Sequence, residues 1–225
     1  MTKEVNKLIS MCFDSLDQAV KLVSENPSLL NMRTGLGETP LHYLVVEDQI
    51  EAVKQLVKLG AEVNTISNVN GTPLSEAASL GYESMVLYLL KQGAEIEISG
   101  QNDPTLIEGI RSGNVEVVKL LLEYGANFDS TDSLGNTGLH VAADDDNRSE
   151  VLEYLIDKGA DIEERALFRW TPLHTAAFYG CEKNVRKLLA AGADTNSSDK
   201  DGCTPFDLAE SQNHKDVAGL LRGIQ

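Results

Sequence analysis

The chain has 225 residues, and its 35 acidic against 19 basic residues give a formal net charge of −16. A charge of this sign repels nucleic acid and anionic membranes and attracts basic surfaces; the alternative is that it only keeps the protein soluble. No apolar run approaches the roughly 18 residues of a membrane-spanning helix, and the N-terminus lacks the apolar block of a secretory signal. We therefore expect a cytoplasmic protein that binds neither nucleic acid nor membrane.

The cysteines are few and widely spaced, at Cys12, Cys181 and Cys203. An odd number with no Cys-x-x-Cys pair indicates neither a disulfide framework nor a zinc site. Free thiols in a reducing compartment are the simplest interpretation.

The N-terminal segment carries two short amphipathic patterns, over residues 5–12 and 16–23. Each predicts a helix, and Asn26-Pro27 ends the second.

A short phrase then recurs along the chain. It reads Thr39-Pro40-Leu41-His42, Thr72-Pro73-Leu74-Ser75, Pro104-Thr105-Leu106-Ile107, Thr137-Gly138-Leu139-His140, Thr171-Pro172-Leu173-His174 and Thr204-Pro205-Phe206-Asp207. The first five leucines are 33, 32, 33 and 34 residues apart. A Gly-Ala pair follows each of the first five copies about twenty residues later, from Gly60-Ala61 to Gly192-Ala193. Two phrases that share one period indicate a structural repeat.

Each copy predicts a turn followed by two helices. The Thr caps a helix by accepting a main-chain hydrogen bond, and the Pro suits the first helical position. Alanine pairs such as Ala176-Ala177 allow close helix packing. Glycines such as Gly180, and the Gly of each Gly-Ala pair, suit the left-handed residue that ends a helix.

This phrase and period resemble the ankyrin family. The resemblance implies an all-α solenoid of stacked helix-turn-helix units with hairpin tips. It predicts a single domain over residues 1–225 of about seven units, at 1–36, 37–69, 70–101, 102–134, 135–168, 169–201 and 202–225, the first and last being degenerate caps. It also implies that the phrase histidines tie adjacent turns together by hydrogen bonds.

Several units depart from the pattern. The phrase at Pro104 reverses its first two residues, with Gly109-Ile110 in place of an alanine pair, and Gly138 replaces Pro. One extra residue falls within 144–148, and another before Trp170. The run of Asp144, Asp145 and Asp146 lacks the alternating ligands of a calcium loop, so we interpret it as a turn or an acidic contact rather than a cation site.

A group of aromatic residues marks the candidate partner-binding site. Phe168, Trp170, Phe178 and Tyr179 lie within twelve residues, beside Arg169, although aromatic residues make up only 5% of the chain. Trp, Tyr and Arg are typical of interface hot spots. In the ankyrin family, partners meet the turn tips and first helices, which adds Arg111, Leu134, Asn136, Asp144 and Asp145. The alternative is that the rings pack on the neighbouring unit.

No motif of an enzyme, phosphate loop or metalloprotease occurs, so we predict no catalytic, cofactor-binding or metal-binding residues. The sequence predicts a monomeric, non-enzymatic module that binds a basic protein, in the manner of a stoichiometric inhibitor or immunity protein. A scaffold or secreted effector that tethers a host protein is the alternative, and an enzyme or metal protein is the third.

Overall fold

The fold is all-helical in the part of the chain that the computed structural model describes, residues 2–69 and 71–223. These residues form fourteen α-helices and three short 3₁₀ helices, with one isolated bridge between Thr131 and Thr137 and no strand. The helices pair as about seven units require, so the predicted fold class is confirmed. None of the described helices is both long and apolar enough to cross a bilayer.

Apart from its repeat units, the chain divides into two compact parts. One is Met1–Gly109 with Lys119–Ala126, and the other is Ile110–Val118 with Asn127–Gln225. Helices α7 (Thr105–Ser112) and α8 (Val115–Glu123) contribute residues to both. The single domain over residues 1–225, with the boundaries of its seven units, stays a prediction.

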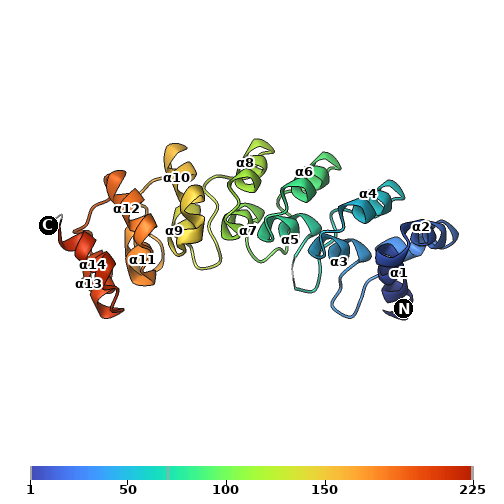
Figure 1. Cartoon of the computed structure of the whole chain (residues 1–225), viewed down its shortest axis with the longest axis horizontal. Coiled ribbons are helices and arrows are strands. Elements are labelled where there is room, and N and C mark those ends of the chain that lie inside the picture. The colour runs from blue at the N-terminus through green and yellow to red at the C-terminus, as the bar shows by residue number, and fades with distance from the viewer. Residues whose placement is uncertain (1, 70, 224–225) are drawn as a thin grey trace. The chain divides into compact units, whose positions relative to one another are not determined.

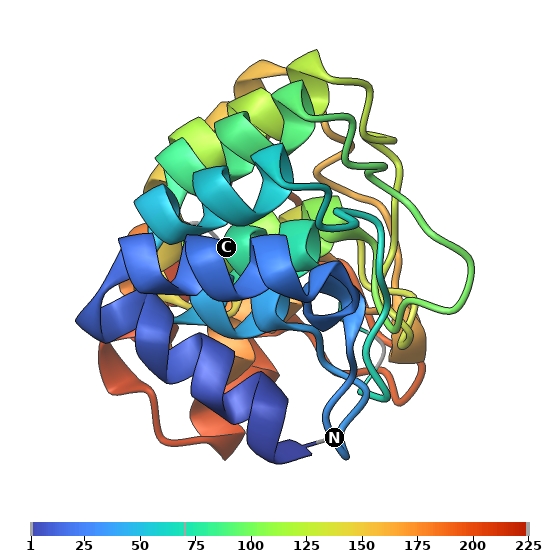
Figure 2. The same cartoon turned by 90° about the vertical axis from the view of Figure 1, so that its right-hand side faces the viewer.

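The N-terminal part is a series of helix pairs, shown in blue to green in Figure 1. Its elements are α1 (Thr2–Asp14), α2 (Leu16–Glu25), η1 (Pro27–Asn31), α3 (Pro40–Val46), α4 (Ile50–Lys58), α5 (Pro73–Ser79) and α6 (Glu83–Lys91). The first helices pack in sequence, α1 on α3 and α3 on α5, and each packs on its own second helix. Their connecting segments run together on one side of the helices (Figure 2). Leucines such as Leu41 and Leu74 fill the core between the helices.

The C-terminal part has the same arrangement of helix pairs. It contains α9 (Gly138–Ala143), η2 (Asp146–Arg148), α10 (Ser149–Asp157), η3 (Leu167–Arg169), α11 (Pro172–Tyr179), α12 (Glu182–Ala190), α13 (Pro205–Ser211) and α14 (Lys215–Arg222). The first helices again pack in sequence, α9 on α11 and α11 on α13.

The predicted helix signals act as expected. The hydroxyl of Thr72 accepts a hydrogen bond from the N–H of Ser75, and Pro73 begins the helix. Ala176 and Ala177 are fully buried between helices. Gly180 ends α11 in the left-handed region, at φ 73°.

Two departures from the repeat pattern, Gly138 and Ile110, compensate for each other in the packing. A Cβ atom on Gly138 would lie 2.7 Å from Cδ1 of Ile110, which is fully buried. The larger side chain at the usual alanine position therefore fills the space that the missing proline ring would need. The extra residue at 144–148 is absorbed by the short helix η2.

Candidate aromatic groove

The four aromatic residues singled out by the sequence form one connected cluster. Trp170 follows η3, and its ring centroid lies 6.3 Å from that of Phe168 and 5.0 Å from that of Phe178. Tyr179, at the end of α11, meets Phe178 edge-on with centroids 5.2 Å apart. Such tilted and perpendicular arrangements are the favourable ones for aromatic pairs.

Trp170 is half-buried and held from two directions. Its indole N–H donates to Oδ2 of Asp199 over 3.1 Å. Its main-chain carbonyl lies 2.9 Å from Nε2 of His140. A carbonyl can only accept, so Nε2 carries the proton and Nδ1 accepts from the hydroxyl of Thr137 at 2.8 Å. Trp170 therefore has a structural role as well as an exposed face.

The phrase histidines link neighbouring turns, as the resemblance implied, in two of three cases. His174 repeats the arrangement of His140, with Nε2 3.3 Å from the carbonyl of Cys203. His42 keeps the contact with Thr39, but its Nε2 has no hydrogen-bond partner among the described residues. Burial lowers the pKa of all three rings, which favours the neutral form.

A groove of about 250 Å³ opens beside Trp170. We call it the aromatic groove. It is lined by Arg111, Asp132, Leu134, Asn136, His140, Val141, Asp144, Leu167, Phe168, Trp170, Thr175 and Tyr179. The structure thus brings together seven of the ten predicted partner-binding residues, and Asp145, Arg169 and Phe178 lie outside the lining.

The rim of the groove is apolar and accessible. Leu134 is 60% exposed, Tyr179 55%, Leu167 49% and Phe168 45%. Grouped exposed apolar side chains of this kind are typical of interaction sites, whereas single ones are ordinary. The ammonium of Lys200 lies 3.8 Å above the ring of Phe168 and covers one of its faces.

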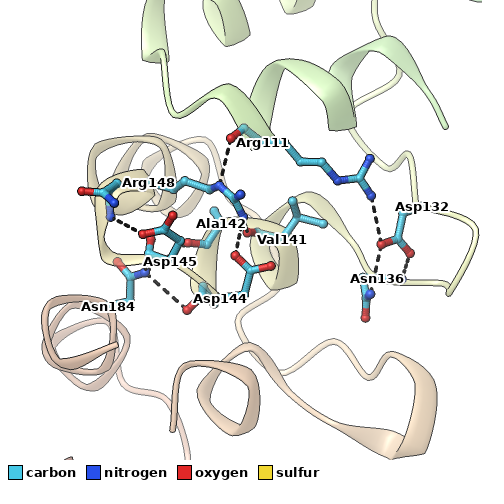
Figure 3. Close-up of polar contacts among 11 residues, drawn as sticks. Arg111, Asp132, Asn136, Val141, Ala142, Asp144, Asp145, Arg148 and Asn184 are labelled. Carbon is cyan, nitrogen blue, oxygen red and sulfur yellow. Dashed lines mark hydrogen bonds and ion pairs between the residues drawn. The ribbon is translucent and has the colours of Figure 1, made fainter. Parts of the chain in front are cut away.

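The acidic side chains of the lining are Asp132 and Asp144, which we call the polar floor, and Asp132 was not predicted from the sequence. Its Oδ1 accepts the N–H groups of Leu134 and Asn136 at 2.9 and 2.8 Å. Its Oδ2 accepts the Asn136 amide at 3.0 Å and the Arg111 guanidinium at 3.4 Å (Figure 3). The carboxylate is therefore fully engaged. The equal spacing of Asp132 to Gly135 and Asp199 to Gly202 was the signal that could have revealed it.

Asp144 is the other residue of the polar floor and is less fully compensated. Its Oδ1 pairs with the guanidinium of Arg148, which also donates to the carbonyls of Val141 and Arg111 (Figure 3). Burial raises the pKa of Asp144, and the charges of Arg148 and Arg111 oppose this effect.

The other two acidic residues of the tract have local roles. Asp145 accepts the N–H of Asn147 and so begins η2. Asp146 accepts the N–H groups of Lys183 and Asn184 at the start of α12. These are turn and helix-cap contacts. Within residues 2–69 and 71–223, no group of three His, Cys, Asp or Glu side chains is arranged to hold a metal ion.

Comparison with known proteins agrees with this architecture. The sequence model of the family described as "Ankyrin repeats (3 copies)" matches residues 8–100, 101–166 and 139–225. The crystal structure of the human ASB11 ankyrin repeat domain is similar with a TM-score of 0.82 and 25% identity, over 95% of this chain and 96% of that one.

Two curated relatives are similar over most of this chain. A Caenorhabditis elegans homologue of transient receptor potential cation channel subfamily A member 1 is 34% identical over 88% of this chain and 17% of its own length. The nuclear factor NF-kappa-B p105 subunit of Gallus gallus is 31% identical over 87% and 20%. This chain thus spans about a fifth or less of these two relatives.

Proposed function

Because this chain belongs to the ankyrin-repeat family, whose repeats are generally protein–protein interaction modules, we propose that it binds a basic protein through the aromatic groove. The observation that carries the proposal is the groove itself, where an accessible apolar rim surrounds a polar floor that includes Asp144. An apolar centre within a polar surround is the usual anatomy of a protein interface.

The charge of the chain supports a basic partner. A net charge of −16 attracts positive surfaces and speeds their encounter. A chain of acidic net charge with an accessible apolar groove suits a stoichiometric inhibitor that covers a basic site on its target. The residues proposed to meet the partner include Arg169, Phe178 and Asp145, which flank the groove, together with its predicted lining.

Capture of a partner from the native source with purified protein tests the proposal, followed by affinity measurement at rising salt. We expect affinity to fall between low and high salt, because opposite charges are screened beyond about 10 Å at 0.1 M. An affinity that is unchanged over this range would contradict a basic partner.

The variant Trp170→Ala tests the groove directly. Loss of the Trp170 indole should weaken partner binding by about 2 kcal/mol or more, while circular dichroism still shows a folded helical protein. The matched control is Tyr124→Ala, because Tyr124 is also aromatic and 43% exposed but lies outside the groove. Parental affinity in the Trp170 variant, or its unfolding, would remove Trp170 as a hot spot.

A further inference from the structure

Resting on the proposed function, we propose that the aromatic groove takes a single arginine side chain of the protein partner. The guanidinium group would meet the carboxylate of Asp144, and the aliphatic stem would lie against Leu134 and Trp170. The partner is thereby specified as a protein with an exposed arginine at the centre of its binding surface.

The size of the groove suits one side chain. Its volume of about 250 Å³ is below the range of about 300–1,000 Å³ that holds drug-sized ligands. Its apolar walls, formed by Leu134, Val141 and Trp170, accommodate methylene groups. An arginine combines such a stem with a charged, hydrogen-bonding head.

The polar floor favours a cation, and specifically at Asp144. Asp132 accepts four hydrogen bonds and is already paired with Arg111. Asp144 has one described hydrogen-bonded cation, Arg148, whose guanidinium is shared with two main-chain carbonyls, and the charge of Arg111 also acts on it. The side chain of Asp144 is 36% exposed, so a second cation can reach it. Because burial disfavours its charge, a charged hydrogen-bond partner would be more effective there than at a solvated carboxylate.

The charge of the lining agrees. Of the charged side chains that line the groove, Asp132 and Asp144 are acidic and Arg111 is basic, which leaves one negative charge.

The aromatic wall favours arginine over lysine. A planar guanidinium stacks on aromatic faces as well as forming directed hydrogen bonds, whereas an ammonium is a compact, strongly hydrated point charge. Lys200 shows that a cation is held over a ring of this rim. It covers a face of Phe168, so Trp170 and Tyr179 are left for the partner.

The experiment uses the one tryptophan of the full chain as its reporter. The indole ¹H–¹⁵N resonance of Trp170 is followed while N-acetyl-arginine methylamide is added at constant ionic strength. The citrulline derivative, which has the same shape without the charge, and the lysine derivative are titrated in parallel. We expect a saturable shift with arginine, and binding weakened about tenfold for the other two, which corresponds to about 1.4 kcal/mol.

Variants test the two ends of the groove. Asp144→Asn should weaken arginine binding about tenfold, and Leu134→Ser, at an exposed position, should weaken it without loss of fold. The matched control is Asp157→Asn, which removes the same charge from an exposed position on α10 outside the groove. Thermal melting of each variant verifies that it is folded.

Equal binding of the citrulline or lysine derivative would overturn the assignment of arginine. Parental binding by a folded Asp144→Asn variant, or by Leu134→Ser if Asp144→Asn does not fold, would overturn the placement. If the arginine derivative binds but the capture experiment recovers no protein partner, the proposed function is removed and the groove chemistry stays intact. A partner whose affinity is unaffected by Asp144→Asn in a folded protein would support the function and exclude this inference.

Discussion

The hairpin tips at residues 132–136 and 166–170 follow the same path and are held in opposite ways. In each, the first residue donates its N–H to the carbonyl four residues later, and the fourth donates back to the first. In the 132–136 tip, the Asp132 side chain binds two further N–H groups, and Gly135 adopts φ 78°. In the 166–170 tip, Ala166 has no polar side chain, and the glycine position is Arg169, at φ 60°.

The 166–170 tip therefore carries backbone strain that the other avoids. Phe168, at φ 64°, is a second left-handed residue beside Arg169, and non-glycine residues in this region cost about 1–3 kcal/mol each. Arg165 partly compensates by donating to the carbonyls of Arg169 and Ser198 at 3.0 Å each. The strained tip is also the one that presents Phe168 to the groove. Stability and an accessible apolar rim are in opposition here, as they often are at binding sites.

The largest effect that we expect comes from removing the support of the well-held tip. Asp132→Ala leaves two tip N–H groups without their acceptor and removes one contact of the Arg111 guanidinium, which should cost about 3 kcal/mol of unfolding free energy. Urea denaturation measures it. Asp201→Ala is the control, since Asp201 is an exposed tip residue, and its effect should be within about 0.5 kcal/mol. Equal losses in both would show that Asp132 stabilises its tip no more than an exposed carboxylate does.

A smaller effect concerns the histidine that joins the two tips. His140→Ala removes the bond to the Trp170 carbonyl and should cost about 1–3 kcal/mol. The pKa of His140 is lowered by burial, so the unfolded chain binds protons more readily. Stability should therefore begin to fall as pH drops through the unfolded value of about 6.5 and continue to fall toward the lower folded pKa.

The pH dependence provides the check on His140. Denaturation at pH 7 and pH 5 should show a smaller acid-induced loss in His140→Ala than in the parent, because one of the responsible groups is gone. His214→Ala serves as a histidine control outside the repeat phrase. An unchanged acid response in His140→Ala would contradict the buried neutral ring.

The smallest effect that we expect is an increase in stability. Arg169→Gly relieves the left-handed strain at φ 60° and should stabilise the protein by about 1 kcal/mol. Arg169→Ala removes the same charge but keeps the strain, so it should bring no such gain. Calorimetric melting of both variants decides between them, and an equal rise in melting temperature in both would assign the effect to the lost charge.

Much of the fold follows from the sequence because its signals are local. Thr171, Pro172 and Gly180 act within one or two helical turns, and their spacing repeats from unit to unit. The sequence also predicted seven residues of the groove lining, since the tips and first helices recur at known positions in each repeat. The part played by those residues in binding stays a prediction.

The tertiary structure decided what depends on the next unit along the chain. Arg148 reaches the carbonyl of Arg111, 37 residues away, and Ile110 fills the space above Gly138. Trp170 is half-buried, and its indole N–H donates over 3.1 Å to Asp199, 29 residues away. These contacts depend on side-chain conformations and on the packing of neighbouring helices, which no local spacing encodes. The repeat therefore determined the architecture, and contacts between adjacent units decided which surface was left open.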